Sequence, residues 1–245
     1  MVSEHIIKSY DEELQKLDNI ITQMGGLAEN QLAAAIEAVA KSDTLMASRA
    51  VESDAEIDDL EREVEAMVVR LLALRQPMAR DLRQIVASLK ISSDLERIGD
   101  YAANVAKRSL TLALAPQVRP VRAIPRIGAL ALRMVKDIVD AYVERDADKA
   151  LAVWLRDEEL DEMYTSLFRE LLTYMIEDPR SITVCTHLLF MAKNLERVGD
   201  LTTNIAERLY FVVHGVPLTQ IRPKGDRTSL QTDPGRDDDK TEESA

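Results

Sequence analysis

Two stretches of this 245-residue chain, one hundred residues apart, have closely related sequences. Residues 92–108 read SSDLERIGDYAANVAKR and residues 192–208 read AKNLERVGDLTTNIAER, and eight of these seventeen positions are identical. Chance gives about one identity over such a length, so the similarity indicates an internal duplication. Earlier in the chain, similar residues recur at a spacing of about 103: Asp43 and Asp146, Asp54 and Asp157, Asp58 and Asp161, and more loosely Gly25 and Gly128. Each half should therefore form the same unit, and a site in one half should have a counterpart in the other.

The composition of the chain favours helices. Gly and Pro number only eight each and aromatic residues make up 4%, whereas strands are rich in aromatic and β-branched residues and turns in Gly and Pro. Prolines break helices, and here they cluster between long segments of helical periodicity. Asp43 and Asp146 offer N-caps at two further boundaries. The pattern predicts six helices, at about 4–40, 43–75, 78–113, 122–144, 147–177 and 180–214.

Long helices with short connections are typical of antiparallel bundles. We therefore predict an all-α fold of six long helices, arranged as two tandem three-helix bundles related by pseudo-two-fold symmetry. The first repeat is expected in residues 1–115 and the second in residues 120–215. Residues 216–245 contain three of the eight prolines and few hydrophobic residues, so they are expected to form a disordered C-terminal tail.

Charge and cysteine content restrict the possible functions. The formal net charge of −12 argues against a nucleic-acid interface, which needs a basic face. The single cysteine, Cys185, excludes an intrachain disulfide and a cysteine-based zinc site. With no apolar run of about 20 residues and a polar, acidic N-terminus, a cytoplasmic protein is expected. Since −10 of the charge falls on the helical body, cations or a partner with a basic surface are the candidate ligands.

The duplicated helix has acidic residues four positions apart, and the preceding helix of each repeat has a second acidic pair at the same spacing. That spacing places both side chains of a pair on one helix face. Two antiparallel helices could thus present four carboxylates to a shared space, which suits Mg²⁺, Mn²⁺ or iron. The candidate metal ligands are Asp54, Asp58, Glu96 and Asp100 in the first repeat and Asp157, Asp161, Glu196 and Asp200 in the second.

A different face of the duplicated helix is apolar and is predicted to point into the core. Its residues are Leu95, Ile98, Ala102 and Val105 in the first copy and Leu195, Val198 and Ile205 in the second. Gly99 and Gly199 fall in the middle of these helices, where glycine costs about 1 kcal/mol relative to alanine. Close helix approach or access to the neighbouring carboxylates would offset that cost.

A less specific interpretation of the carboxylates stays open. Acidic pairs at this spacing are common on solvated helix faces, and Arg97 and Arg197 offer positive charge in place of a metal. A ferritin-like di-iron site is excluded, because none of the three histidines has the required glutamate three residues before it. The sequence also lacks nucleotide-binding loops and a nucleophile paired with a base. We therefore predict that the protein is not an enzyme.

The segments DLERIGDYAANVAKR and NLERVGDLTTNIAER resemble the PhoU family, cytoplasmic regulators of phosphate uptake, and the resemblance covers about residues 1–215. It implies six helices in two three-helix repeats. It also implies an E(D)xxxD motif in each repeat that holds clusters of iron or of other cations such as magnesium, manganese or zinc. The motif positions here are Glu96 with Asp100 and Glu196 with Asp200, and the aspartate pairs of the preceding helices fit the same pattern. Not every member is seen with metal, so a metal-free protein is compatible with the resemblance.

The two motif copies differ beside the acidic residues. Ser93 and Asp94 of the first copy are replaced by Lys193 and Asn194 in the second. If metal binds, the two sites should therefore differ in charge, and the second should be the weaker.

The resemblance also implies a regulatory function with protein partners. The family restrains import through the phosphate-specific ABC transporter and, when phosphate is plentiful, keeps the phosphate-sensing histidine kinase inactive. It acts by contact with the transporter's ATPase side and the kinase, so membrane association is expected only through partners. Family members often form homodimers.

Three hypotheses follow. The first is a non-enzymatic adaptor that represses phosphate uptake and the phosphate-starvation response. The second is a carboxylate-bridged metalloprotein with redox or hydrolytic activity. The third is a metal-free scaffold whose acidic faces dock a basic partner surface.

Overall fold

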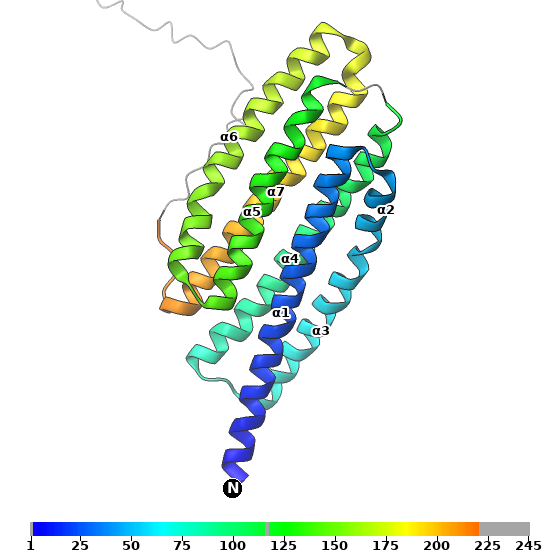
Figure 1. The fold of residues 1–245 in the computed structure, drawn as a ribbon. Coiled ribbons are helices and arrows are strands. Elements are labelled where there is room, and N and C mark those ends of the chain that lie inside the picture. The colour runs from blue at the N-terminus through cyan, green and yellow to red at the C-terminus, as the bar shows by residue number, and fades with distance from the viewer. Residues whose placement is uncertain (1, 116–117, 221–245) are drawn as a thin grey trace, which may run out of the picture.

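The computed structural model describes residues 2–115 and 118–220, and secondary structure in these ranges is entirely helical (Figure 1). The predicted all-α fold class is therefore confirmed. The predicted disorder of residues 221–245 lies outside the described residues. The α-helices are α1 (Val2–Lys41), α2 (Thr44–Glu52), α3 (Asp54–Arg75), α4 (Ala79–Leu112), α5 (Ala123–Glu144), α6 (Ala147–Glu177) and α7 (Ile182–His214), and short 3-10 helices, η1 (Arg119–Arg122) and η2 (Pro179–Ser181), precede α5 and α7.

The helix expected at 43–75 is interrupted, because Ser53 forms a turn between α2 and α3. The backbone carbonyl of Ala50 accepts hydrogen bonds from the Ser53 hydroxyl, at 3.1 Å, and from the Gln31 amide, at 2.9 Å. Side chains that compete for backbone carbonyls in this way bend or end helices. In the second repeat Met134 and Arg156 stand at the positions of Gln31 and Ser53, and α6 is continuous.

Four helices form the centre of the bundle. Helix α1 packs against α4 and α5, and α7 packs against α4 and α5, while α2 and α3 flank α1 and α4, and α6 flanks α5 and α7 (Figure 1). The buried apolar side chains form one cluster that includes residues from both repeats. The predicted core stripes of α4 and α7 are all within it, at 0–2% exposure, as are Trp154 and Cys185. The two three-helix units thus share one hydrophobic core.

Matching residues of the two repeats make reciprocal contacts where α1 and α5 pack together. A Cβ atom added to Gly25 would lie 2.7 Å from Val139, and one added to Gly128 would lie 2.7 Å from Ile36. Gly25 and Gly128 are 103 residues apart, as are Ile36 and Val139. These contacts are what pseudo-two-fold symmetry requires, and the glycines let the helices approach closely.

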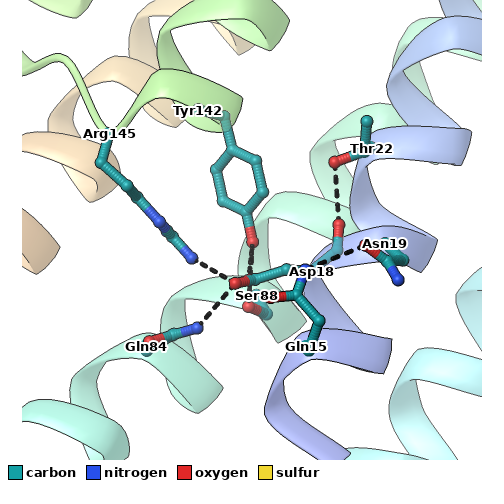
Figure 2. A network of polar contacts seen from close by, with 8 residues as sticks. All are labelled: Gln15, Asp18, Asn19, Thr22, Gln84, Ser88, Tyr142 and Arg145. Atoms are coloured by element: carbon teal, nitrogen blue, oxygen red, sulfur yellow. Dashed lines mark hydrogen bonds and ion pairs between the residues drawn. The ribbon is translucent and has the colours of Figure 1, made fainter. Parts of the chain in front are cut away.

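A polar network joins α1, α4 and α5 at one end of this interface (Figure 2). The Asp18 carboxylate accepts hydrogen bonds from Tyr142 at 2.7 Å, Arg145 at 2.6 Å and Gln84 at 2.9 Å. Ser88 Oγ lies 3.4 Å from the Tyr142 hydroxyl. Burial, together with the Asp18 charge, raises the pKa of Tyr142, so the phenol stays a hydrogen-bond donor. The network fixes the first repeat to the second.

The repeats do not preserve this network at the symmetry-related end. The positions matching Asp18, Gln84, Tyr142 and Arg145 hold small or apolar residues, which line a cavity of about 540 Å³: Val121, Val184, Val39 and Ser42. One end of the bundle is therefore held by charged hydrogen bonds and the other contains a cavity.

Candidate carboxylate site

The acidic residues of the first repeat lie together where α3 packs against α4. Asp54 of α3 and Asp100 of α4 lie within hydrogen-bonding reach of each other. Partial burial and the neighbouring acidic groups raise the pKa of Glu96 to about 7. Burial and the charges of Asp54 and Asp58 raise the pKa of Asp100 as well. All four candidate residues of this repeat therefore interact, as predicted from their spacing.

A fifth carboxylate, Glu61 on α3, belongs to this group and was not predicted. Its charge contributes to the raised pKa of Glu96, and its own pKa is raised by burial and by Glu65, Asp58 and Asp100. Glu61 follows Asp58 by three residues and Asp54 by seven, so all three share one helix face. A search for acidic stripes longer than one turn would have found it. We call Asp54, Asp58, Glu61, Glu96 and Asp100 the first acidic group.

Gly99 explains how α3 comes close enough to α4. A Cβ atom at this position would lie 2.9 Å from Ile57 and from the Gln31 side-chain oxygen, and 3.4 Å from Asp54. The missing side chain thus provides both the close helix approach and the access to carboxylates that would offset the cost of a mid-helix glycine. Gln31 also donates a 3.0 Å hydrogen bond to Asp54 and so holds that carboxylate beside α4.

The second repeat has the same four acidic positions at the contact between α6 and α7, where three of the carboxylates are buried. Here an ammonium group lies among them. Lys193 donates a 2.7 Å hydrogen bond to Glu196 and lies 4.9 Å from the centre of the Tyr164 ring. Burial raises the pKa of Glu196 to about 7; Lys193 opposes the shift, and Asp200 and Asp161 add to it. We call Asp157, Asp161, Glu196 and Asp200 the second acidic group.

The substitutions between the groups are complementary. Lys193 replaces Ser93, and Tyr164 stands where the first repeat has Glu61. The second acidic group therefore has one carboxylate fewer and an internal cation, with an aromatic ring that stabilises the ammonium. Gly199 has the role of Gly99, because its missing Cβ makes room for Leu160 and Asp157.

Asp94, beside the first acidic group, behaves differently from expectation. Asp94 does not add charge to the first acidic group, because it is buried and forms an ion pair with Arg208 of α7. The difference between the groups therefore depends on Lys193 and Glu61 rather than on the change from Asp94 to Asn194.

The duplicated arginines are not the counter-ions of the carboxylates. Arg97 donates to the Tyr101 hydroxyl at 3.3 Å, and the Arg197 guanidinium lies 5.7 Å from the centre of the Tyr101 ring. Within residues 2–115 and 118–220, neither arginine forms an ion pair with a carboxylate. The suggestion that these arginines neutralise the acidic groups is wrong for the described structure.

The first acidic group has the donor chemistry of a hard-cation site. It offers five carboxylates, whose mutual repulsion a bound cation would relieve. Among the described residues, however, no three His, Cys, Asp or Glu side chains are arranged closely enough to hold a metal ion. The residue types fit a cation, and side-chain movement would be needed to form the ligand set.

The fold and this site define the class of the protein: a duplicated three-helix protein with an acidic group in each repeat. The sequence model of the PhoU domain matches residues 21–109 and again residues 124–209. The chain belongs to the PhoU family.

Known relatives match this chain over most of its length. A protein of Caulobacter vibrioides named as a phosphate-specific transport system accessory protein PhoU homolog is 53% identical over 92% of this chain and 98% of its own length. The crystal structure of PhoU from Pseudomonas aeruginosa matches with a TM-score of 0.82 and 38% identity, covering 84% of this chain and 100% of that one. The phosphate transport system regulatory protein PhoU from Streptococcus pneumoniae matches with a TM-score of 0.79 and 31% identity, over 86% and 100% of the two chains.

No helix in the described part of the chain is long and apolar enough to cross a membrane.

Proposed function

We propose that this chain is a negative regulator of phosphate uptake and of the phosphate-starvation response. The observation on which the proposal rests is the complete pair of PhoU domains, each with its own acidic group. The names of the relatives support it, since they describe accessory and regulatory proteins of phosphate transport systems.

The proposed mode of action is protein contact in the cytoplasm. The partners are the ATPase side of the phosphate ABC transporter and the phosphate-sensing histidine kinase, and the protein reaches the membrane only through them. The first acidic group favours partner surfaces with lysine and arginine, because complementary charge guides association and selects partners. Asp157, Asp161 and Glu196 of the second group are buried. We also propose a homodimer, as the family resemblance implies.

The first acidic group is the proposed cation site, and the second is the weaker one. Asp54, Asp58 and Glu61 from α3 would hold the ion together with Glu96 and Asp100 from α4. A bound divalent or trivalent cation, iron or manganese for example, would supply the positive charge that Lys193 supplies in the second repeat. It would thereby fix α3 against α4 and change the charge that a partner meets.

We propose no catalytic reaction. In the described residues Cys185 is fully buried, and His187 and His214 contact Arg108 and Tyr210 rather than an acidic group. A hydrolytic or redox metalloprotein is the alternative, and it predicts turnover by the metal-loaded protein.

Deletion of the gene in its host tests the regulatory proposal. Phosphatase expression and phosphate uptake should rise in phosphate-rich medium, and unchanged levels would contradict the proposal. Elemental analysis and a phosphatase assay of the purified protein test the alternative, because turnover that is lost in Glu96→Ala and Glu196→Ala variants would support an enzyme.

A further inference from the structure

A hollow of about 510 Å³ lies between α4 and α7. Its lining residues are Arg97, Tyr101, Arg197, Asp200, Leu201 and Asn204. All six belong to the two duplicated segments, two residues to the first copy and four to the second. The hollow therefore forms where the two copies of the motif meet across the α4–α7 contact.

The duplication brings two guanidinium groups to this one hollow. Arg97 and Arg197 are equivalent positions of the two copies. Equivalent acidic residues separate into two groups, with α3 and with α6, whereas the equivalent arginines line the same space. Tyr101 lies between them, since its hydroxyl accepts from Arg97 and its ring faces Arg197. One aromatic side chain thus orients both cations.

The guanidinium groups are available to an anion. Both are exposed, and in the described structure their contacts are with Tyr101 rather than with a carboxylate. Arginine presents donors in a planar fork that matches the oxygens of phosphate and carboxylate. Tyr101 adds a hydroxyl and Asn204 an amide, so the lining offers several donors from both repeats.

Asp200 makes the hollow selective. An ionised carboxylate only accepts hydrogen bonds, so it repels an anion that has no proton. Hydrogen phosphate differs from sulfate in having an O–H group, which can donate to such a carboxylate while the remaining oxygens accept from arginines. A site that combines arginines with one carboxylate therefore rejects sulfate by an unfavourable contact and not only by a weaker favourable one.

We propose that this hollow binds a tetrahedral oxyanion that carries a proton near neutral pH, namely inorganic hydrogen phosphate. The anion is held between Arg97 and Arg197, and its O–H group donates to Asp200. The binding claim rests on these contacts alone. A regulatory response of this protein to bound phosphate is a second step, and that step rests on the proposed function.

Titration calorimetry of the purified full-length chain tests the proposal, with inorganic phosphate, phosphoserine and sulfate as separate titrants near pH 7.5. We expect saturable binding of phosphate and at least tenfold weaker binding of sulfate. The phosphoryl group of phosphoserine has a second pKa near 6 and therefore no proton at this pH, so phosphoserine should bind as weakly as sulfate. No saturable phosphate binding, or equal binding of sulfate or phosphoserine, would overturn the proposal.

Variants connect the binding to the hollow. Arg97→Gln and Arg197→Gln should each weaken phosphate binding about tenfold or more, since each loses charge-assisted hydrogen bonds. Tyr101→Phe keeps the ring but loses the hydroxyl and should weaken binding less. Arg133→Gln removes the same charge from an exposed position on α5 and is the matched control. Equal weakening by the control would indicate a general charge effect and overturn the site.

The anion site and the proposed regulatory function can be disproved independently of each other. Binding is measured on the purified protein, whereas regulation is measured by phosphatase expression in the host. A protein that represses phosphatase expression but binds no phosphate would overturn only the anion site.

Discussion

The Lys193 ammonium lies 2.7 Å from the Glu196 carboxylate, at the position where the first repeat has Ser93. This pair makes the two acidic groups chemically different although the sequence duplicates them. The second acidic group contains its own ammonium group, whereas in the first the neighbouring carboxylates contribute to the raised pKa values of Glu96 and Asp100. A difference of this kind predicts different responses to mutation, pH and added metal.

Replacement of Lys193 should destabilise the second repeat. Lys193→Met leaves Glu196 buried beside Asp161 and Asp200 without a counter-charge. We expect the free energy of unfolding to fall by about 1–3 kcal/mol near pH 8. This is less than for a fully buried pair, because Lys193 is one-third exposed. The loss should be smaller near pH 5, where Glu196 is protonated. Urea unfolding measures it.

The control is Lys149→Met, because Lys149 is similarly exposed and pairs with Glu144 at the surface. Its effect should be below about 1 kcal/mol at either pH. Equal losses from the two variants would show that the contact between Lys193 and Glu196 stabilises the protein no more than a surface ion pair does.

Stability should fall as the pH rises through neutrality. The pKa values of Glu96 and Glu196 are about 7 in the folded protein, above the ordinary 4.5. Between these values the folded state retains protons that the unfolded chain has lost, so the free energy of unfolding decreases with increasing pH. Urea unfolding between about pH 5 and pH 8 should show this decrease in the wild type. The double variant Glu96→Gln/Glu196→Gln should show a smaller one; an identical pH dependence would rule out these two groups as its source.

Alanine at the motif glycines should be destabilising even though alanine is the better helix former. The new methyl group of Gly99→Ala would meet Ile57 and Gln31, and that of Gly199→Ala would meet Leu160 and Asp157. We expect a loss of about 1–3 kcal/mol for each. Gly26→Ala is the matched control, since nothing lies within 4 Å of its new atom. The free energy of unfolding of this control should rise by up to about 1 kcal/mol. A rise for Gly99→Ala as well would contradict the close packing of α3 on α4.

Metal should stabilise the protein through the first acidic group. After treatment with a chelator, Mn²⁺ at one hundred times its dissociation constant should add about 2.7 kcal/mol, which raises the Tm by about 5–10 °C. Glu61→Gln/Glu96→Gln should lose most of this shift, and Asp161→Asn/Glu196→Gln should retain it. Equal losses from the two double variants would contradict the assignment of the stronger site to the first repeat.

Much of this architecture could be predicted from the sequence, because local signals and the global fold agree. The Asp43 and Asp146 caps accept hydrogen bonds from the first turns of α2 and α6, as expected from their positions. The apolar periodicity identified the buried face of α4 and α7 because one face of a helix packs against its neighbours. The same spacing placed the four acidic residues of each repeat in one group.

The remaining features depend on contacts between distant segments. The break at Ser53 needs Gln31, which is more than twenty residues earlier and takes up a backbone carbonyl of α2. The ion pair between Asp94 and Arg208 and the convergence of Arg97 with Arg197 depend on how α4 crosses α7. Periodicity within one helix specifies a face but not the residue opposite it, so these partners could not be predicted.

Complementation of a deletion strain tests the central claim most directly. The host lacking this gene would receive the wild-type chain, the first-group variant Asp58→Asn/Asp100→Asn, or the control Arg133→Gln, each at equal protein level. Phosphatase activity in phosphate-rich medium should be high in the deletion strain and low with the wild type or the control. It should stay high with the first-group variant, because that group is the proposed site of cation and partner contact. Low phosphatase activity in the deletion strain itself would contradict the account.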